Sequence, residues 1–213
     1  SYAVRKVDKG IEPPSLTDWK AANPVGNYTG LTNRERVDIR FYCVREQFYI
    51  CAYCCQAITG QNDDCMNEHV EARKLAPHRS LDYKNIVASC TALNQCDDSH
   101  GAQPLPLTPF MNECETEFRF KISGRIEGLS ARAEETIRVL NLGDTETNNR
   151  ALIEKRKQLV STLMLKNGLN AEEGLEDDDL LRAVIEDIST PADGHLEAFS
   201  PVMVNILRQW ITA

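Results

Sequence analysis

The sequence lacks several features that would place the chain in a special class of protein. It has no apolar run of about 18 or more residues, so we expect no transmembrane helix. The segment 1–10 is charged and has no apolar centre, unlike a secretory signal, and we therefore expect a cytoplasmic protein. Internal repeats and low-complexity tracts are also missing. With 42% hydrophobic and 26% charged residues, the 213-residue chain has the composition of an ordinary globular protein.

Positive charge is also scarce in this sequence. The formal net charge is -8 and the isoelectric point is near 5.1, with much of the acidity toward the C-terminus, including the run Glu176–Asp179. Proteins that bind nucleic acid alone usually carry excess Lys and Arg, because phosphate contacts dominate their affinity. The charge balance therefore argues against a zinc-containing regulator that binds nucleic acid by itself. An enzyme of this composition that acts on nucleic acid would need a partner to help hold its substrate.

Cysteine is missing after residue 114, and all of it is crowded into the first part of the chain. The eight positions are Cys43, Cys51, Cys54, Cys55, Cys65, Cys90, Cys96 and Cys114. Disulfides are rare in the cytosol, so a metal site is the more natural use for so many cysteines. The only close pair with the two-residue spacing of a zinc knuckle is Cys51 and Cys54.

A second pair is needed to complete a four-ligand zinc site. Cys90 and Cys96 supply it, although the five residues between them exceed the usual two. We predict a structural zinc ion held by Cys51, Cys54, Cys90 and Cys96, with Cys65 and Cys114 as spare ligands. The alternative is that these cysteines are small buried core residues.

Hydrophobic periodicity and turn residues predict an α+β chain in two parts. The elements expected in the first part are helices at 15–20 and 32–47, strands at 49–54, 56–60 and 65–70, a short helix at 82–90, and a hairpin over 118–129 that turns at Ser123-Gly124. The helices expected in the second part lie at 130–141, 146–167, 175–189 and 200–211. We therefore predict two domains, at 1–129 and 130–213.

Side chains suited to phosphodiester hydrolysis lie between and just after the cysteine pairs. Glu68 and His69 are on a predicted strand, Asn85 follows, and Asp97 and His100 come shortly after Cys96. An imidazole titrates near neutral pH and can accept a proton from water, while carboxylate and imidazole groups bind divalent ions. An acid next to a histidine is common on any protein surface. The position of this pair between the cysteine pairs is what favours a catalytic role.

This order of residues resembles the HNH, or ββα-metal, nuclease motif, in which zinc cysteines frame a strand pair and a helix. Further motifs are similar to those of the PtuB-type HNH endonucleases, which belong to Septu antiphage systems and are also found in retron systems. The motifs are Arg5–Gly10, Glu12-Pro13, Ser15-Leu16 with Trp19, Cys51-Ala52-Tyr53-Cys54, Glu68-His69 and Asp82–Cys90. The resemblance covers roughly residues 4–130, and past that point only the all-helical character is shared.

The resemblance implies a fold and a set of site residues. The expected fold is an α+β chain with a ββα-metal (HNH) nuclease core and a structural zinc ion, followed by a mostly α-helical C-terminal region. His69 would be the general base, and Asn85 would fix the loop that positions it. Glu68, Asp97 and His100 would ligate a catalytic Mg²⁺ or Mn²⁺ ion.

The sequence departs from the HNH pattern at the predicted catalytic metal site. Glu68 stands where many HNH enzymes have Asp, and Asp97 stands where many relatives have His or Asn. The long stretch between Cys90 and Cys96 makes the register of Asp97 uncertain, and Asp98 is the obvious substitute ligand.

The resemblance also implies substrates and partners. The substrate would be DNA, with RNA, including tRNA, as the other option, and Lys74, His78 and Arg79 are candidates to contact its phosphates. The partner would be a PtuA-type ABC ATPase, joined in retron systems by a reverse transcriptase and its RNA–DNA product. The C-terminal helices are either a core packed on the nuclease or a docking surface for that partner. The alternative function is a non-catalytic zinc-ribbon interaction module.

Overall fold

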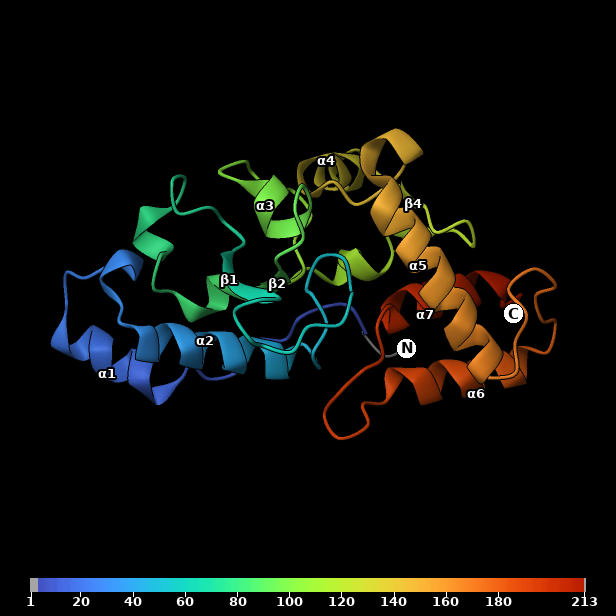
Figure 1. Cartoon of the computed structure of the whole chain (residues 1–213), viewed down its shortest axis with the longest axis horizontal. Helices are drawn as coiled ribbons and strands as arrows, with labels where there is room; N and C mark the ends of the chain where they lie inside the picture. The colour runs from blue at the N-terminus through green and yellow to red at the C-terminus, as the bar shows by residue number, and fades with distance from the viewer. Residues whose placement is uncertain (1–3, 213) are drawn as a thin grey trace.

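The structure is a computed structural model that describes residues 4–212, so residues 1–3 and 213 of the two predicted domains lie outside it. Within this range the fold is α+β, as predicted, with seven α-helices and two antiparallel sheets of two strands each (Figure 1). The helices are α1 (Pro14–Ala22), α2 (Asn33–Glu46), α3 (Cys96–His100), α4 (Ala131–Leu140), α5 (Glu146–Lys166), α6 (Asp178–Ser189) and α7 (Ser200–Trp210). The strands are β1 (Cys65–His69), β2 (Ile86–Cys90), β3 (Phe118–Phe120) and β4 (Ile126–Gly128). Short 3₁₀ helices are η1 (Tyr28–Gly30), η2 (Pro77–Arg79), η3 (Tyr83–Asn85) and η4 (Asn112–Glu115).

Helix α2 begins with a capping box at Thr32. Thr32 and Glu35 form a capping box, in which each side chain satisfies backbone N–H groups at the helix start. The buried face of the helix, with Ile39, Cys43 and Val44, packs against the β1–β2 hairpin, and Figure 1 shows α2 running beneath it. The predicted helix at 32–47 is therefore confirmed to within a residue at each end.

The hairpin of β1 and β2 corrects one prediction. The expected helix at 82–90 is wrong: only the single 3₁₀ turn η3 forms, and residues 86–90 are strand β2, fully buried and paired antiparallel with β1. Ile86 and Val87 are β-branched and favour an extended backbone, and burial on both faces explains why no alternating pattern was visible.

The side chain of Gln47, the residue that follows α2, hydrogen-bonds to the edge of β2 that does not pair with β1. The Gln47 amide accepts a hydrogen bond from the Ala88 N–H and donates one to the Ala88 carbonyl, both at 2.8 Å. A side-chain amide thus takes the place of a third strand at the buried edge, which leaves these backbone groups satisfied.

The knuckle segment between α2 and β1 corrects a second prediction. The strands expected at 49–54 and 56–60 are wrong, because residues 51–55 form turns and a single bridge joins Ile50 to Ala57. The Cys55 N–H donates to the Cys51 carbonyl at 3.0 Å, and Cys55 has a left-handed φ of 69°. The tight turn returns the chain after a few residues and leaves no length for a strand.

The C-terminal part follows the sequence pattern closely. The hairpin of β3 and β4 and the helices α4 to α7 confirm the expected elements. The Asn205 side chain on α7 accepts from the Phe120 N–H at 2.8 Å and donates to the Phe118 carbonyl at 2.9 Å, which docks α7 on β3. One continuous cluster of buried apolar residues runs from Val4 to Leu207 and includes both sides of the predicted domain boundary. Within residues 4–212, every helix is too short or too polar to span a bilayer.

The N-terminal segment is fixed across the fold by two charged side chains. A carboxylate oxygen of Glu115 accepts hydrogen bonds from the backbone N–H groups of Val4, Arg5 and Lys6, at 2.9, 2.6 and 2.7 Å. The Arg5 guanidinium is buried and donates to the Tyr53 carbonyl and to Cys55 Sγ. The motif at 5–10 therefore lies against the cysteine-rich turn.

Arg156 on α5 is the largest fully buried side chain among the described residues. Its guanidinium donates to the carbonyls of Gly124, Leu142 and Gly143 at 2.6, 3.0 and 3.2 Å, which ties the β3–β4 turn to the end of α4. Burial lowers the pKa of Arg156 to about 10, a value at which it still carries its charge near neutral pH.

We expect Arg156→Met to lower the free energy of unfolding by about 2–4 kcal/mol, because the buried carbonyls lose their charged donors. Urea unfolding at a fixed zinc concentration measures this loss. The control is Arg150→Met on an exposed position of the same helix, which should change stability by less than about 0.5 kcal/mol. Equal effects of the two substitutions would contradict the assigned role of Arg156.

Candidate metal centre and active site

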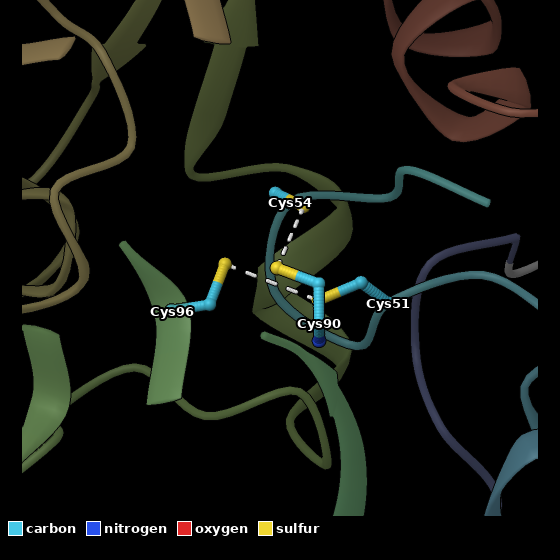
Figure 2. A group of neighbouring side chains, drawn as sticks. All are labelled: Cys51, Cys54, Cys90 and Cys96. Atoms are coloured by element: carbon cyan, nitrogen blue, oxygen red, sulfur yellow. Dashed lines mark hydrogen bonds between the residues drawn. The ribbon is translucent and has the colours of Figure 1, made fainter. Parts of the chain in front are cut away.

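The structure brings the four predicted zinc ligands together from three separate segments. Cys51 and Cys54 lie in the turn after α2, Cys90 ends β2, and Cys96 begins α3, and all four are buried. Their sulfur atoms lie within 4.8 Å of one another and turn toward a common centre (Figure 2). The Cys51–Cys96 and Cys54–Cys90 sulfur distances are both 3.9 Å. Four thiolates at the usual Zn–S length stand about 3.8 Å apart, so this group fits a zinc ion.

Local backbone geometry explains how the long second spacing closes the site. Asn94 and Cys96 both have left-handed φ values, of 60° and 52°, which turn the chain back toward β2. The Cys90 N–H and the Gln95 amide point at the sulfurs, with Cys90 N to Cys51 Sγ at 3.3 Å and Gln95 Nε2 to Cys90 Sγ at 3.7 Å. Burial raises the pKa of Cys54 and Cys96 well above the ordinary value, whereas at Cys51 burial is outweighed by hydrogen bonds from the other three cysteines, which lower its pKa well below that value. Four thiolates together at this point would therefore need a bound cation.

A hydrogen-bond chain joins this centre to the C-terminal helices. Asn149 Nδ2 donates to Gln95 Oε1 at 3.0 Å, and the Gln95 amide in turn points at the Cys90 and Cys96 sulfurs. Asn149 leaves helical geometry inside α5 and accepts from the Leu152 N–H at 3.1 Å, so it also caps the long straight part of that helix. Partners of this kind orient the ligands of a metal site.

The other cysteines stay outside the centre. Among the described residues, the four sulfurs form the one group of three or more Cys, His, Asp or Glu side chains close enough to hold a metal ion. The spare ligands Cys65 and Cys114 are not part of it, and like all eight cysteines they are free thiols.

Glu68 and His100 form a second buried group, a hydrogen-bonded pair. Glu68 Oε2 lies 2.8 Å from His100 Nδ1, and His100 Nε2 lies 2.8 Å from the Gln103 carbonyl. A carbonyl only accepts, so Nε2 carries a proton and Nδ1 faces the carboxylate. Burial raises the pKa of Glu68 to about 7. Burial alone would lower the pKa of His100, but Glu68 raises it above the ordinary value. The pair therefore shares a proton between its facing atoms near neutral pH.

The donor atoms of this pair also suit a divalent cation. Carboxylate oxygen and imidazole nitrogen ligate Mg²⁺ and Mn²⁺, and neighbouring ligands of an octahedral ion lie about 3 Å apart. The Tyr53 hydroxyl is buried near the Glu68 carboxylate, burial and this carboxylate raise the pKa of Tyr53, and the hydroxyl makes no hydrogen bond of good geometry with a described residue. Both observations fit an ion or water at this point.

The predicted third ligand lies next to the pair without completing a compact set of three. The Asp97 N–H is fixed by Ser89 Oγ at 3.1 Å, and burial raises the pKa of its carboxyl, which is near Glu68 and His100. The substitute Asp98 accepts from the Asn94 N–H at 2.7 Å, so it stabilises the turn before α3.

His69 points to the other side of β1 from Glu68, as adjacent strand residues do. Its ring is buried, and Nε2 lies 2.8 Å from the Ser80 carbonyl, so Nε2 carries a proton and Nδ1 is the basic nitrogen of the neutral ring. Burial lowers the pKa of His69 below its ordinary value, with a further lowering by the charge of Arg73. The imidazole is therefore neutral near pH 7, the form that can accept a proton.

Asn85 holds the two ends of the loop that follows His69. Its Oδ1 accepts from the Glu71 N–H at 2.9 Å, and its Nδ2 donates to the Glu71 carbonyl at 3.0 Å. The Val70 N–H also donates to the Asn85 carbonyl at 2.9 Å, which extends the β1–β2 pairing by one bond. These bonds close the loop that follows His69, and the positioning role of Asn85 in catalysis stays a prediction.

The three predicted phosphate contacts have different surroundings. Lys74 and His78 are exposed, and Lys74 lines a cleft beside His69. The Arg79 guanidinium is engaged by Glu71 at 2.7 Å and by Asp82 at 3.0 Å, so its charge is already paired.

Several residues that shape the site were missed by sequence reasoning. Ser80 and Tyr28 contact His69 only through the tertiary fold, and no local motif marks them. Tyr53 and Gln95 lie next to zinc-ligand candidates in the sequence, but their contacts with the site depend on the fold. Comparison with models of known protein families and with curated protein sequences found no match for this chain.

We expect purified protein to contain about one zinc ion per chain, because four buried thiols surround one point. Cys96→Ala should remove most of that zinc and lower the melting temperature. The matched control is Cys65→Ala, which removes an equally buried thiol from the residue opposite Cys90 in the β1–β2 register. Metal analysis of both variants by mass spectrometry decides the outcome. Full zinc content in Cys96→Ala would show that Cys96 is not a ligand.

Proposed function

We propose that this protein is a metal-dependent endonuclease of the HNH type that hydrolyses phosphodiester bonds. Its proposed substrate is DNA, with RNA, including tRNA, as the alternative. Its proposed role is that of an effector in an antiphage defence complex. One observation carries the proposal: a β-hairpin and a following helix, closed by four thiols, bring a neutral imidazole and a Glu–His pair to adjacent residues at the end of one strand.

The proposed division of labour follows from these contacts. His69 accepts a proton from the attacking water at Nδ1, because Nε2 is committed to the Ser80 carbonyl. Asn85 keeps the loop after His69 closed and thereby fixes the direction of the ring. Glu68 and His100 would hold Mg²⁺ or Mn²⁺, with Asp97 beside them, and the ion would supply charge for the phosphate and the leaving oxygen.

The proposed partner is an ABC-type ATPase similar to PtuA, joined in a retron system by a reverse transcriptase and its RNA–DNA product. The net charge of -8 supports a nuclease that needs help to hold nucleic acid. Co-purification of the two proteins tests this step, and a nuclease that runs alone at every mixing ratio would count against it.

One observation favours the alternative function of a zinc-ribbon interaction module. The side chains of Glu68, His69 and His100 are 5%, 6% and 0% exposed, and Glu68 and His100 are hydrogen-bonded to each other. A site so closed would have to open to admit a phosphate. Electron paramagnetic resonance with added Mn²⁺ separates the two functions: the nuclease binds Mn²⁺ in wild type and loses it in Glu68→Gln, whereas the module binds none in either.

We expect wild-type protein with Mg²⁺ or Mn²⁺ to cut plasmid DNA or total RNA, and His69→Ala to cut roughly 10²–10⁴-fold more slowly, the usual contribution of a general base. The assay runs with and without the ATPase. His195→Ala is the control, since this histidine is exposed and stacks on Tyr49, and it makes no contact with Glu68, His69 or His100 among those the structure describes. Equal rates for wild type and His69→Ala would remove His69 from the mechanism.

A further inference from the structure

A cleft of about 450 Å³ opens beside the proposed general base. Its walls come from three places in the chain: the turn at η1, the loop 72–80 after β1, and the turn at 101–102 that follows α3. The volume is within the range of roughly 300–1,000 Å³ that is usual for ligand pockets.

The cleft is positively charged in a protein that is otherwise acidic. Arg73 and Lys74 are the only charged residues among those that line it, and no Asp or Glu contributes to its walls. Both side chains are exposed, and within residues 4–212 neither has an ion-pair partner. The contrast is Arg79 on the same loop, whose charge is taken by Glu71 and Asp82. The charges of Arg73 and Lys74 are therefore available to an anion.

The cleft adjoins the proposed general base and the turn that follows α3. Two of its lining residues contact His69 directly: the Tyr28 ring meets the imidazole edge-on at 4.8 Å, and the Ser80 carbonyl accepts from Nε2 at 2.8 Å. A third lining residue, Gly101, directly follows His100. An anion bound in the cleft would thus lie next to the proposed base and next to the end of α3.

Tyr28 holds one cation of the cleft in a defined place. The Arg73 guanidinium lies over the Tyr28 ring, 5.0 Å from its centroid, and the Arg36 guanidinium lies over the same ring at 5.1 Å. The ring is fixed in turn, because Asn67 Nδ2 donates to its hydroxyl at 3.1 Å and the Tyr28 N–H donates to Ser80 Oγ at 3.2 Å. A guanidinium held over an aromatic ring keeps its N–H donors at its edge, where they suit a phosphate.

We propose that this cleft binds the phosphodiester backbone of the nucleic-acid strand being cut, with Arg73 and Lys74 as the phosphate contacts. The inference rests on the proposed nuclease function and deepens it by naming the surface that receives the substrate. Contacts of this type recognise phosphates, and they distinguish neither base nor sugar. DNA and RNA strands therefore share this cleft.

The test measures binding apart from cleavage. Fluorescein-labelled 20-nucleotide strands of DNA and of RNA, and a DNA duplex, are titrated with His69→Ala protein in Ca²⁺, and anisotropy is recorded at several salt concentrations. We expect Arg73→Gln with Lys74→Gln to raise Kd about tenfold or more and to lower the salt slope by about one for each cation removed. Lys84→Gln is the matched control, an exposed cation that does not line the cleft. Zinc content and melting temperature confirm that each variant is folded.

Each outcome bears separately on the cleft and on the nuclease. Weaker binding in the double variant alone, with unchanged binding in Lys84→Gln, supports the cleft, and it does so even if wild-type protein cuts nothing. Unchanged affinity and salt slope in the double variant would contradict the proposal that the cleft binds the strand. Cutting by wild-type protein would then still support the nuclease function. Binding that is equally weak in all proteins at low salt also overturns the cleft. The nucleic acid with the lowest Kd among the three ligands identifies DNA or RNA as the strand that the cleft holds.

Discussion

The four-thiol centre is the constraint on which the candidate site depends. It joins the turn after α2, the end of β2 and the start of α3, three segments that come from different secondary-structure elements. The hairpin has only five paired residues in each strand, and α3 has only five residues, so neither element would be stable alone. A metal ion bound at the thiols would fix the end of β2 against the start of α3. The position of His100 opposite Glu68 follows from that junction.

Burial of polar groups around this centre is tolerated because nearly all of them have partners. Glu68 and His100 satisfy each other, His69 donates to a carbonyl, and the Gln95 amide connects the sulfurs to Asn149 on α5. An unpaired charge at the same depth would cost several kcal/mol. The chain through Gln95 adds a polar connection between the cysteine-rich part and the helical C-terminal part, which also share one continuous apolar core.

The sequence predicted the elements that depend on local signals. Apolar periodicity predicted α2 and the C-terminal helices. The four cysteines were also found from their positions, although Cys96 is reached through a left-handed turn that spacing does not reveal. Strand β2 was missed because a fully buried strand shows no alternation and resembles a buried helix. The fold brings separate loops together around His69, which creates its contacts with Ser80 and Tyr28. The exposure of the Arg73 charge in the cleft likewise depends on these loops.

Amide hydrogen exchange, measured by mass spectrometry before and after zinc is removed with a chelator, tests the central dependence most directly. If the thiol centre organises the site, removal should increase exchange in residues 51–56, in 65–69 with 86–100, and near Asn149, while α2 and α7 keep most of their protection. Unchanged exchange in the hairpin and α3 after complete loss of zinc would contradict the account, because the site would then be held by packing alone.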